Sequence, residues 1–396
     1  MTVSCAVKPV VNPRPALKAK LTKELFLIPN LKPSYRDWPT AVNPSYPQLK
    51  VALETRIKEY YHPKKAAKLI QDDYALLSAM WWPRAAPDRL QTCTFWFLWL
   101  FTWDDEIDQS TSDLFVNIHN ANDFRKESLE YVKFCLGVGD EETAKWDFEN
   151  HPPQRKLIRS LDVIGAELRK VYNYDQIMTF VNEIDYYMDC QQREQQRKLT
   201  GRLPIVAEYL ETRMGTSAVT SMLALNEFAD GNDIPREIMT DPKMISLWYE
   251  VIMNMSLSND LLSLRKEIEH GDIDSMVPVL VSARGLTIHE AIKETEEEIS
   301  RSIDRFDQIA DAFLKETRIT HTDHADELAD YIVGCQYNQM ANFLWSGLTD
   351  IVKILIEAGA DVHAATVAWK ETNIKPTGSY QGTPVPGKDS PFTSLL

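Results

Sequence analysis

Helical periodicity runs through most of this chain and restricts its fold more than any other feature. Between residues 49 and 346, several segments carry apolar side chains at third and fourth positions, and no alternating run reaches strand length. Glycine is scarce, with 14 residues among 396, and strong helix formers fill long runs of the sequence. We therefore expect an all-α fold of roughly ten helices.

The periodicity also predicts where these helices lie and how the chain is organised. Residues 1–45 are expected to form an irregular arm, because repeated prolines leave no room for a long helix. Residues 46–346 are expected to form one helical domain. Its predicted helices span 49–60, 64–78, 88–108, 123–136, 153–171, 175–196, 204–228 with an interruption near Gly215, 242–270, 287–316 and 324–346.

The end of the chain differs from this helical domain in character. Residues 347–369 begin with GLTDIVKILIEAGADV, which resembles the second half of an ankyrin repeat. A single repeat cannot bury its own apolar face, so we expect a lone amphipathic helix docked on or near the bundle. Residues 370–396 are rich in Pro, Gly, Ser and Thr, and we expect them to form a disordered tail.

Charge and cysteine usage exclude several functional classes. The net charge of −15 argues against nucleic acid and against anionic membrane surfaces, because both require a basic face. The five scattered cysteines fit a reducing compartment. The most apolar run, at 95–101, is far shorter than the roughly 20 residues of a spanning helix. We expect a soluble cytoplasmic protein, either monomeric or homodimeric, with no stable membrane insertion.

The segment DDEID at 104–108 is the first candidate for metal binding. It places the carboxylates of Asp104 and Asp108 one helical turn apart. Solvated acids at the end of a helix are the simpler interpretation of this segment alone. Acids oppose the macrodipole at a helix C-terminus, however, so they serve a ligand better than they serve stability.

A second candidate lies far downstream in the segment NDLLSLRKE at 259–267. Asn259, Ser263 and Glu267 fall at successive fourth positions, which places them along one helical stripe. Carboxylate, amide and hydroxyl oxygens suit Mg²⁺, which completes its coordination with water and substrate phosphate. The two segments therefore indicate two half-sites that hold metal ions against a phosphorylated ligand.

In this order, the two motifs resemble those of the class I terpene cyclases, most closely the fungal sesquiterpene synthases. The resemblance extends over roughly residues 45–346 and includes the complete pattern NDxxSxxKE, with Lys266 before Glu267. Between the motifs, GRLP at 201–204 followed by Tyr209 and Arg213 is similar to the segment that leads to the family's diphosphate-sensing arginine.

The resemblance implies a helical bundle that encloses an apolar active-site cavity. It further implies that three Mg²⁺ ions hold the diphosphate of farnesyl diphosphate, to which Arg213 and Lys266 donate hydrogen bonds. Thr216 and Ser217 occupy the place where family members break a helix and expose a backbone carbonyl. The implied activity is that of a carbon–oxygen lyase acting on phosphates, which cyclises farnesyl diphosphate to a sesquiterpene and releases diphosphate.

Aromatic residues precede the first motif and are candidates for the wall of the cavity. Phe97 and Phe101 share a helix face with Asp104, and ring faces attract cations by roughly 0.5–2 kcal/mol each. We expect both rings, together with Trp345, to line the substrate pocket and to stabilise a carbocation. Most of the other rings in 95–103 are expected to pack between helices.

One part of the family pattern is absent. Relatives carry a late Arg-Tyr pair several residues after a Trp-Ser, whereas Ile351 and Val352 stand at those positions here. The change reflects a true divergence, replacement by another residue, or a wrongly joined exon, and we favour a disturbed C-terminus. Two alternatives to a farnesyl diphosphate cyclase remain: a cyclase of geranylgeranyl diphosphate, and a catalytically impaired relative whose C-terminal tail binds a partner.

Overall fold

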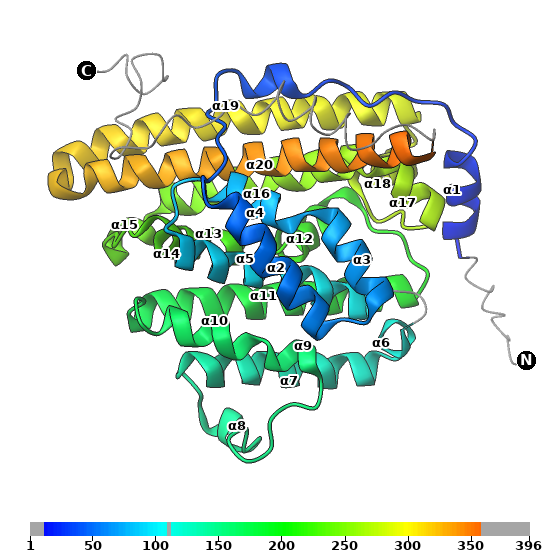
Figure 1. The fold of residues 1–396 in the computed structure, drawn as a ribbon. Coiled ribbons are helices and arrows are strands. Elements are labelled where there is room, and N and C mark those ends of the chain that lie inside the picture. Colours follow the sequence, from blue (N-terminus) through cyan, green and yellow to red (C-terminus); the bar gives the residue numbers. More distant parts are fainter. Residues whose placement is uncertain (1–11, 109–111, 358–396) are drawn as a thin grey trace, which may run out of the picture.

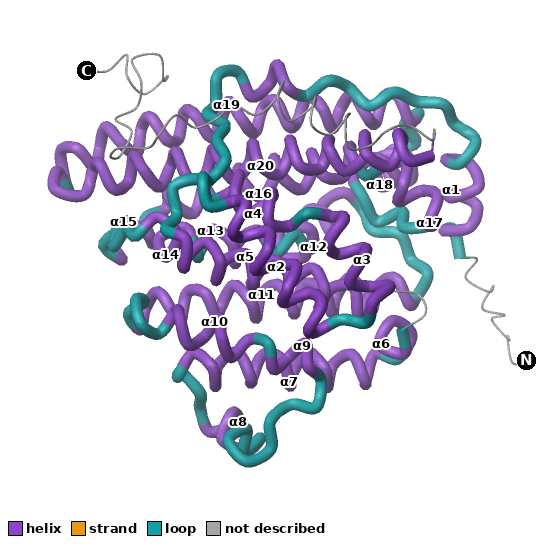
Figure 2. Tube along the Cα trace, viewed as in Figure 1, coloured by secondary structure: helices purple, strands orange, loops and turns teal. Residues whose placement is uncertain are grey.

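The computed structural model describes residues 12–108 and 112–357, with side chains described up to residue 347. Within these ranges every regular element is a helix, and Figure 2 contains helices and loops only. The prediction of an all-α fold is therefore confirmed. Two long helices, α19 (Ile288–Thr320) and α20 (Ala325–Glu357), lie side by side along one edge of the molecule (Figure 1), and α16 (Pro242–Leu262) packs against both.

The remaining helices fill the body of the molecule. Those of the N-terminal half are α1 (Arg14–Leu21), the 3-10 helix η1 (Lys32–Tyr35), α2 (Tyr46–Tyr60), α3 (Pro63–Asp72), α4 (Tyr74–Trp81), α5 (Pro87–Asp108), α6 (Asp113–Val116), α7 (Ile118–Leu136), α8 (Glu141–Ala144), α9 (Lys156–Arg159), α10 (Leu161–Leu168) and α11 (Tyr174–Leu199). Those that follow are α12 (Val206–Thr216), α13 (Val219–Leu223), α14 (Asn226–Asp230), α15 (Arg236–Met239), α17 (Leu264–His270), α18 (Met276–Arg284) and the 3-10 helix η2 (Thr322–His324).

Helix α5 passes through the core and delivers the first acidic motif to its end. It packs against α4 and α10, and Trp96, Trp99 and Trp103 are all buried. A helix that is apolar on nearly every side is stable only inside a protein. The polar residues that follow Trp103 therefore begin where α5 leaves the core.

Several predicted helices are interrupted in the structure. The predicted helix 64–78 is two helices, because Asp73 adopts a left-handed conformation with φ of 52°. This strain is supported locally, since the Asp73 carboxylate accepts hydrogen bonds from the Leu76 amide and the Tyr46 hydroxyl. The predicted helix 242–270 is likewise divided at Ser263 into α16 and α17. Sequence periodicity did not reveal either break.

The predicted domain boundary at residue 346 falls inside a helix. Helix α20 continues through Ser346 to Glu357 without interruption, so the start of the ankyrin-like segment 347–369 extends the domain's last helix. Helix α18 was not predicted at all, although it buries Met276 and Leu280. The remainder of the ankyrin-like segment and the expected disordered tail, 358–396, lie outside the described residues.

The N-terminal arm is more ordered than expected. The predicted irregular region 1–45 contains α1 and η1, and it buries Leu21, Leu31, Tyr35 and Trp38. Figure 1 shows this arm in blue, passing from α1 along α19 to α2. Residues 12–45 of the arm are therefore part of the packed body rather than a separate extension. No helix in the described part of the chain is both long enough and apolar enough to cross a membrane.

Candidate active site

The first wall of the candidate site is the C-terminal end of α5, where Asp104 and Asp108 lie one turn apart as predicted. The Tyr187 hydroxyl on α11 donates a 2.6 Å hydrogen bond to Asp104 Oδ1. Gln191, one turn further along α11, donates to Asp108 Oδ1 over 3.4 Å. Sequence reasoning missed both partners, because nothing in the pattern of α11 relates it to a motif about eighty residues away.

Asp104 is partly exposed and Asp108 is exposed to solvent. Nearby protein nevertheless removes part of the water around both carboxylates. Desolvation raises the pKa of Asp104, the neighbouring Asp108 raises it further, and the Tyr187 hydrogen bond opposes the shift. Desolvation also raises the pKa of Asp108, and Lys198 opposes it. A carboxylate in a concave site is both partly exposed and partly desolvated. A bound cation would stabilise its charged form there.

The second wall is formed where α16 meets α17. Ser263 lies between the two helices, and its hydroxyl is 2.6 Å from the Asn259 carbonyl oxygen and 2.6 Å from Glu267 Oε1. The break therefore keeps the three predicted residues together even though they do not share one continuous helix. Desolvation raises the pKa of Glu267, and the charges of Asp260 and Asp272 raise it further.

Arg213 on α12 joins this second wall. Its Nη2 donates to Asn259 Oδ1 over 2.9 Å and pairs with Asp260 Oδ1 at 3.0 Å. Asp260 is buried, and it also accepts hydrogen bonds from the Tyr209 hydroxyl and the Met276 amide. Sequence reasoning did not single out Asp260, although its place directly after Asn259 was a usable signal. The structure thus brings Arg213 to the triad, as the family resemblance implied.

In the described part of the chain, the side chains of the other predicted polar residues form no hydrogen bond or ion pair with the two walls. Lys266 lies on α17 with an exposed side chain. Thr216 and Ser217 end α12, and the next residue, Ala218, has a left-handed φ of 55° that separates α12 from α13. The expected break is therefore present. The Thr216 hydroxyl is buried without a hydrogen-bond partner among the described residues.

The three predicted pocket aromatics differ in their surroundings. Phe101 is partly buried and stacks on Tyr74, with ring centroids 4.8 Å apart, and Trp345 lies at 6.2 Å from it. Phe97 is 1% exposed, and its ring packs between those of Trp81 and Trp82. Phe97 therefore has the surroundings of a core residue, whereas Phe101 and Trp345 form one aromatic surface with Tyr74.

The donor set fits a divalent metal ion shared between protein and substrate. Within the part of the chain whose side chains are described, no group of three His, Cys, Asp or Glu residues is arranged to hold a metal ion by itself. The oxygen donors instead stand on two walls, and Asp272 raises the pKa of both Asp108 and Glu267 by its charge. Such a site needs phosphate or water to complete the coordination.

A separate groove of about 660 Å³ lies between α11, α12 and α16. It is lined by side chains that include Tyr186, Met214 and Trp248, and none of the predicted site residues is among them. The groove is therefore distinct from the two acidic walls.

An all-α bundle with oxygen-rich half-sites at two helix ends and an arginine beside one of them has the donors of a metal-dependent enzyme that acts on a phosphorylated substrate. The sequence model of the terpene synthase family 2, C-terminal metal binding, matches residues 96–305. The chain belongs to this family, and it therefore uses a divalent metal. The resemblance inferred from the motifs is confirmed.

Relatives and solved structures agree with this assignment. The sesquiterpene cyclase hepA of Aspergillus oryzae is 83% identical over 350 residues, which cover 87% of this chain and 95% of that protein. The crystal structure of α-eudesmol synthase superposes with a TM-score of 0.67 at 16% identity and covers 82% of this chain and 98% of that chain. Hedycaryol synthase in complex with nerolidol gives 0.65 at 18% identity, covering 81% and 100%. The two structures support the fold alone.

Proposed function

We propose that this chain ionises farnesyl diphosphate, cyclises the resulting carbocation to a sesquiterpene and releases diphosphate, as a carbon–oxygen lyase. The observation that carries the proposal is the presence of both oxygen-rich walls and Arg213 in a chain 83% identical to a fungal sesquiterpene cyclase. The finer expectations belong to the same proposal: an enzyme of secondary metabolism that is cytoplasmic, monomeric or homodimeric, and built around the domain 46–346.

The metal ligands in this proposal are Asp104 and Asp108 on one wall and Asn259, Ser263 and Glu267 on the other. We take the metal to be Mg²⁺, because hard oxygen donors and a diphosphate suit it, and we take three ions to be bound, as the family resemblance implies. When bound, such ions supply Lewis-acid neutralisation of the charge that develops on the departing diphosphate. The raised pKa values of Asp104 and Glu267 support this, since a cation would compensate their buried charge.

Arg213 is the principal protein donor to the diphosphate. Its guanidinium is held by Asp260 and Asn259, so the remaining N–H groups keep a fixed direction. Lys266 is the second donor, and its exposed side chain is free to reorient. A backbone carbonyl near Thr216 and Ser217, or the released diphosphate, accepts the proton that ends the cyclisation.

The apolar part of the site shapes the substrate and protects the carbocation from water. The partly buried rings of Phe101 and Trp345 and the buried ring of Tyr74 offer π faces without a nucleophile. Their attraction for a desolvated cation lets the charge migrate along the surface they form. The length of the isoprenoid depends on the depth of the cavity, so geranylgeranyl diphosphate remains the alternative substrate.

The second alternative, a catalytically impaired relative, follows from the late Arg-Tyr pair. Ile351 and Val352 stand in its place within α20. Neither residue type carries a donor for phosphate, and loss of one charged donor corresponds to roughly 2–4 kcal/mol of transition-state stabilisation.

Product analysis tests the proposal. Purified full-length protein is incubated with Mg²⁺ and, separately, with geranyl, farnesyl and geranylgeranyl diphosphates, and volatile products are analysed by gas chromatography with mass spectrometry. We expect a cyclic C15 product from farnesyl diphosphate only. The cyclase hepA is assayed beside it as the positive control. Recovery of intact substrate, while the control is active, would reject the proposal. A cyclic C20 product in its place would favour the diterpene alternative.

A further inference from the structure

The N-terminal arm lies against the helices that carry the second wall of the site. At one end of this contact, the buried Tyr35 hydroxyl is 3.0 Å from Asn254 Oδ1 and 3.0 Å from Ser258 Oγ. Ser258 directly precedes Asn259 in α16. Further towards the N-terminus, the Arg265 guanidinium of α17 lies 4.4 Å from the centre of the Phe26 ring. The arm therefore contacts both helices between which Ser263 is placed.

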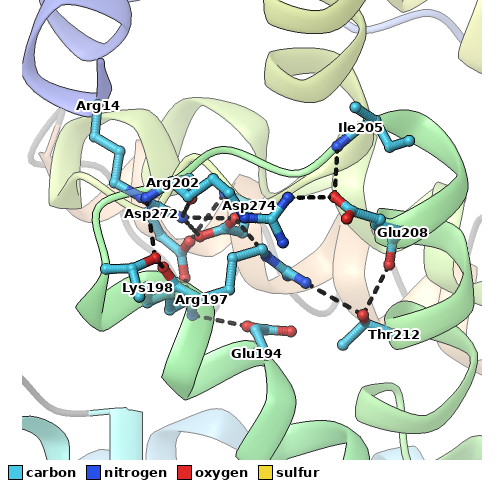
Figure 3. Close-up of polar contacts among 11 residues, drawn as sticks. Arg14, Glu194, Arg197, Lys198, Arg202, Ile205, Glu208, Thr212, Asp272 and Asp274 are labelled. Carbon is cyan, nitrogen blue, oxygen red and sulfur yellow. Dashed lines mark hydrogen bonds and ion pairs between the residues drawn. The ribbon is translucent and has the colours of Figure 1, made fainter. Parts of the chain in front are cut away.

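Arg14 of α1 makes the most specific of these contacts. Its Nη2 lies 2.6 Å and 2.8 Å from the two carboxylate oxygens of Asp274 and donates to the Arg202 carbonyl oxygen at 3.1 Å. Figure 3 shows Arg14 extending from its helix into a cluster of charged residues around Asp272 and Asp274. The Asp274 side chain is 1% exposed, so the ion pair is largely shielded from solvent. Shielding makes such a pair stronger than one on the surface.

Two glycines show how closely the arm approaches the turns that follow α11 and α17. A Cβ atom at Gly271 would stand 2.9 Å from Lys18 Nζ, and one at Gly201 would stand 2.8 Å from the Asn12 side chain. Both glycines have positive φ, 89° and 72° respectively, as the ends of α17 and α11 require. The arm thus packs directly onto the turn that follows the helix of Glu267.

The segment 271–276 connects Arg14 to the site itself. The amides of Gly271 and Asp272 both donate to the Glu267 carbonyl oxygen, at 2.8 Å and 2.9 Å. At the other end of the segment, the Met276 amide donates to Asp260 Oδ2 at 2.8 Å. Asp260 in turn holds Arg213, so Asp274 lies between the two connections.

We propose that the N-terminal arm braces the second wall of the site and that Arg14 is its positioning residue. By fixing Asp274, Arg14 holds segment 271–276, which in turn fixes Glu267 and Arg213 in the geometry that receives metal and diphosphate. The effect of this brace on catalysis rests on the function proposed above. The bracing of segment 271–276 itself does not depend on that function.

A second cation lies beside Asp274. Arg197 Nε lies 3.7 Å from Asp274 Oδ1, so Asp274 keeps a cationic neighbour when Arg14 is replaced. Arg36 provides a matched control on the same arm. Arg36 forms ion pairs with Asp304 and Asp307, which lie on α19 rather than on the second wall. Its side chain is 57% exposed.

Hydrogen–deuterium exchange of the full-length, metal-free protein tests the brace directly. For Arg14→Ala we expect amides in peptides covering 264–276 to exchange at least tenfold faster than in the unaltered protein. Asp274→Asn should reproduce this effect, Arg14→Lys should retain most of the protection, and Arg36→Ala should leave it unchanged. Protection of 264–276 that stays at the original level in Arg14→Ala would overturn the proposal, whatever happens to the melting temperature.

Steady-state kinetics separates positioning from a merely structural role. In Arg14→Ala, the Mg²⁺ concentration for half-maximal turnover should rise at least fivefold, while kcat at saturating Mg²⁺ stays within twofold. Arg36→Ala should leave both quantities unchanged. An unaltered Mg²⁺ dependence in Arg14→Ala would contradict the catalytic consequence. If the unaltered chain shows no turnover, the proposed function fails, and the exchange experiment still decides the brace.

Discussion

The hydroxyl of Tyr187 donates a 2.6 Å hydrogen bond to the carboxylate of Asp104. Tyr187 is buried and its ring packs against Trp103, so the phenol reaches the acidic motif from inside the core. The pair fixes the first carboxylate of the site in one orientation before any ligand binds. Preorganisation of this kind lowers the free energy needed to assemble the site around its substrate.

Replacing Tyr187 with Phe tests this relationship. The ring and its packing remain, but Asp104 loses a hydrogen bond of the charge-assisted kind, worth roughly 1.5–3 kcal/mol. We expect kcat/KM for farnesyl diphosphate to fall by about ten- to a hundredfold, since 1.4 kcal/mol corresponds to a factor of ten. Tyr331→Phe is the matched control, because its buried hydroxyl donates to the Leu223 carbonyl oxygen and not to a site carboxylate. Equal losses in both variants would contradict the role of Tyr187.

The spacing of residues within one helix predicted the candidate site. That spacing could not predict which residues of different helices contact one another. Asp104 and Asp108 lie together because four residues make one turn, and this local geometry can be read from sequence. Tyr187 was missed because its role depends on the packing of α11 against α5. Asp260 was missed although it directly follows Asn259 in the sequence. The break at Ser263 was missed because the apolar period continues across it.

The same distinction explains the differences in the arm. As the repeated prolines predict, no long helix lies in the described residues 12–45, but an eight-residue helix beginning at Arg14 is compatible with Pro13 and Pro15 at its start. The burial of Tyr35 and the ion pair of Arg14 involve partners more than two hundred residues away. No periodicity within the arm contains that information.

The two predicted pocket phenylalanines should respond differently to substitution. Phe97→Ala removes a fully buried ring, so we expect a loss of roughly 3–5 kcal/mol in the free energy of unfolding. Phe101→Ala removes a partly buried ring from the surface shared with Tyr74 and Trp345. There we expect a smaller loss of stability and a shift of products towards linear or hydrated sesquiterpenes. Denaturant unfolding and product profiles measure the two effects. A normal product profile in Phe101→Ala would place Phe101 in the core as well.

Glu227 gives the fold a predictable dependence on pH. Desolvation raises its pKa to about 7, while hydrogen bonds from the Ile234 amide and Gln176 oppose the shift. A carboxyl whose pKa is higher in the folded state stabilises the fold at low pH. That stabilisation is lost as the pH rises from about 4.5, where the unfolded group titrates, through about 7.

Glu227→Gln should remove this dependence, because the side chain stays neutral and keeps an oxygen for both donors. We expect the variant to exceed the unaltered protein in unfolding free energy by on the order of 2 kcal/mol at pH 8 and to match it near pH 4. Urea unfolding at both pH values measures the difference. Glu149→Gln, at an exposed position, is the control. A gap of the same size at both pH values would show that the effect does not come from titration of Glu227.

The final prediction concerns residues 351 and 352, where the family resemblance leads us to expect an Arg-Tyr pair. Because α20 continues unbroken from Trp345 to Glu357, position 351 lies about 9 Å along the helix from Trp345. A guanidinium introduced there supplies the charged donor that Ile351 lacks. We expect Ile351→Arg combined with Val352→Tyr to raise kcat for farnesyl diphosphate at least tenfold, since such a donor corresponds to roughly 2–4 kcal/mol. Ile351→Met with Val352→Phe is the control for size, and single-turnover measurements separate ionisation from product release. High turnover in the unaltered chain, with no gain from the added pair, would show that other residues already provide this function.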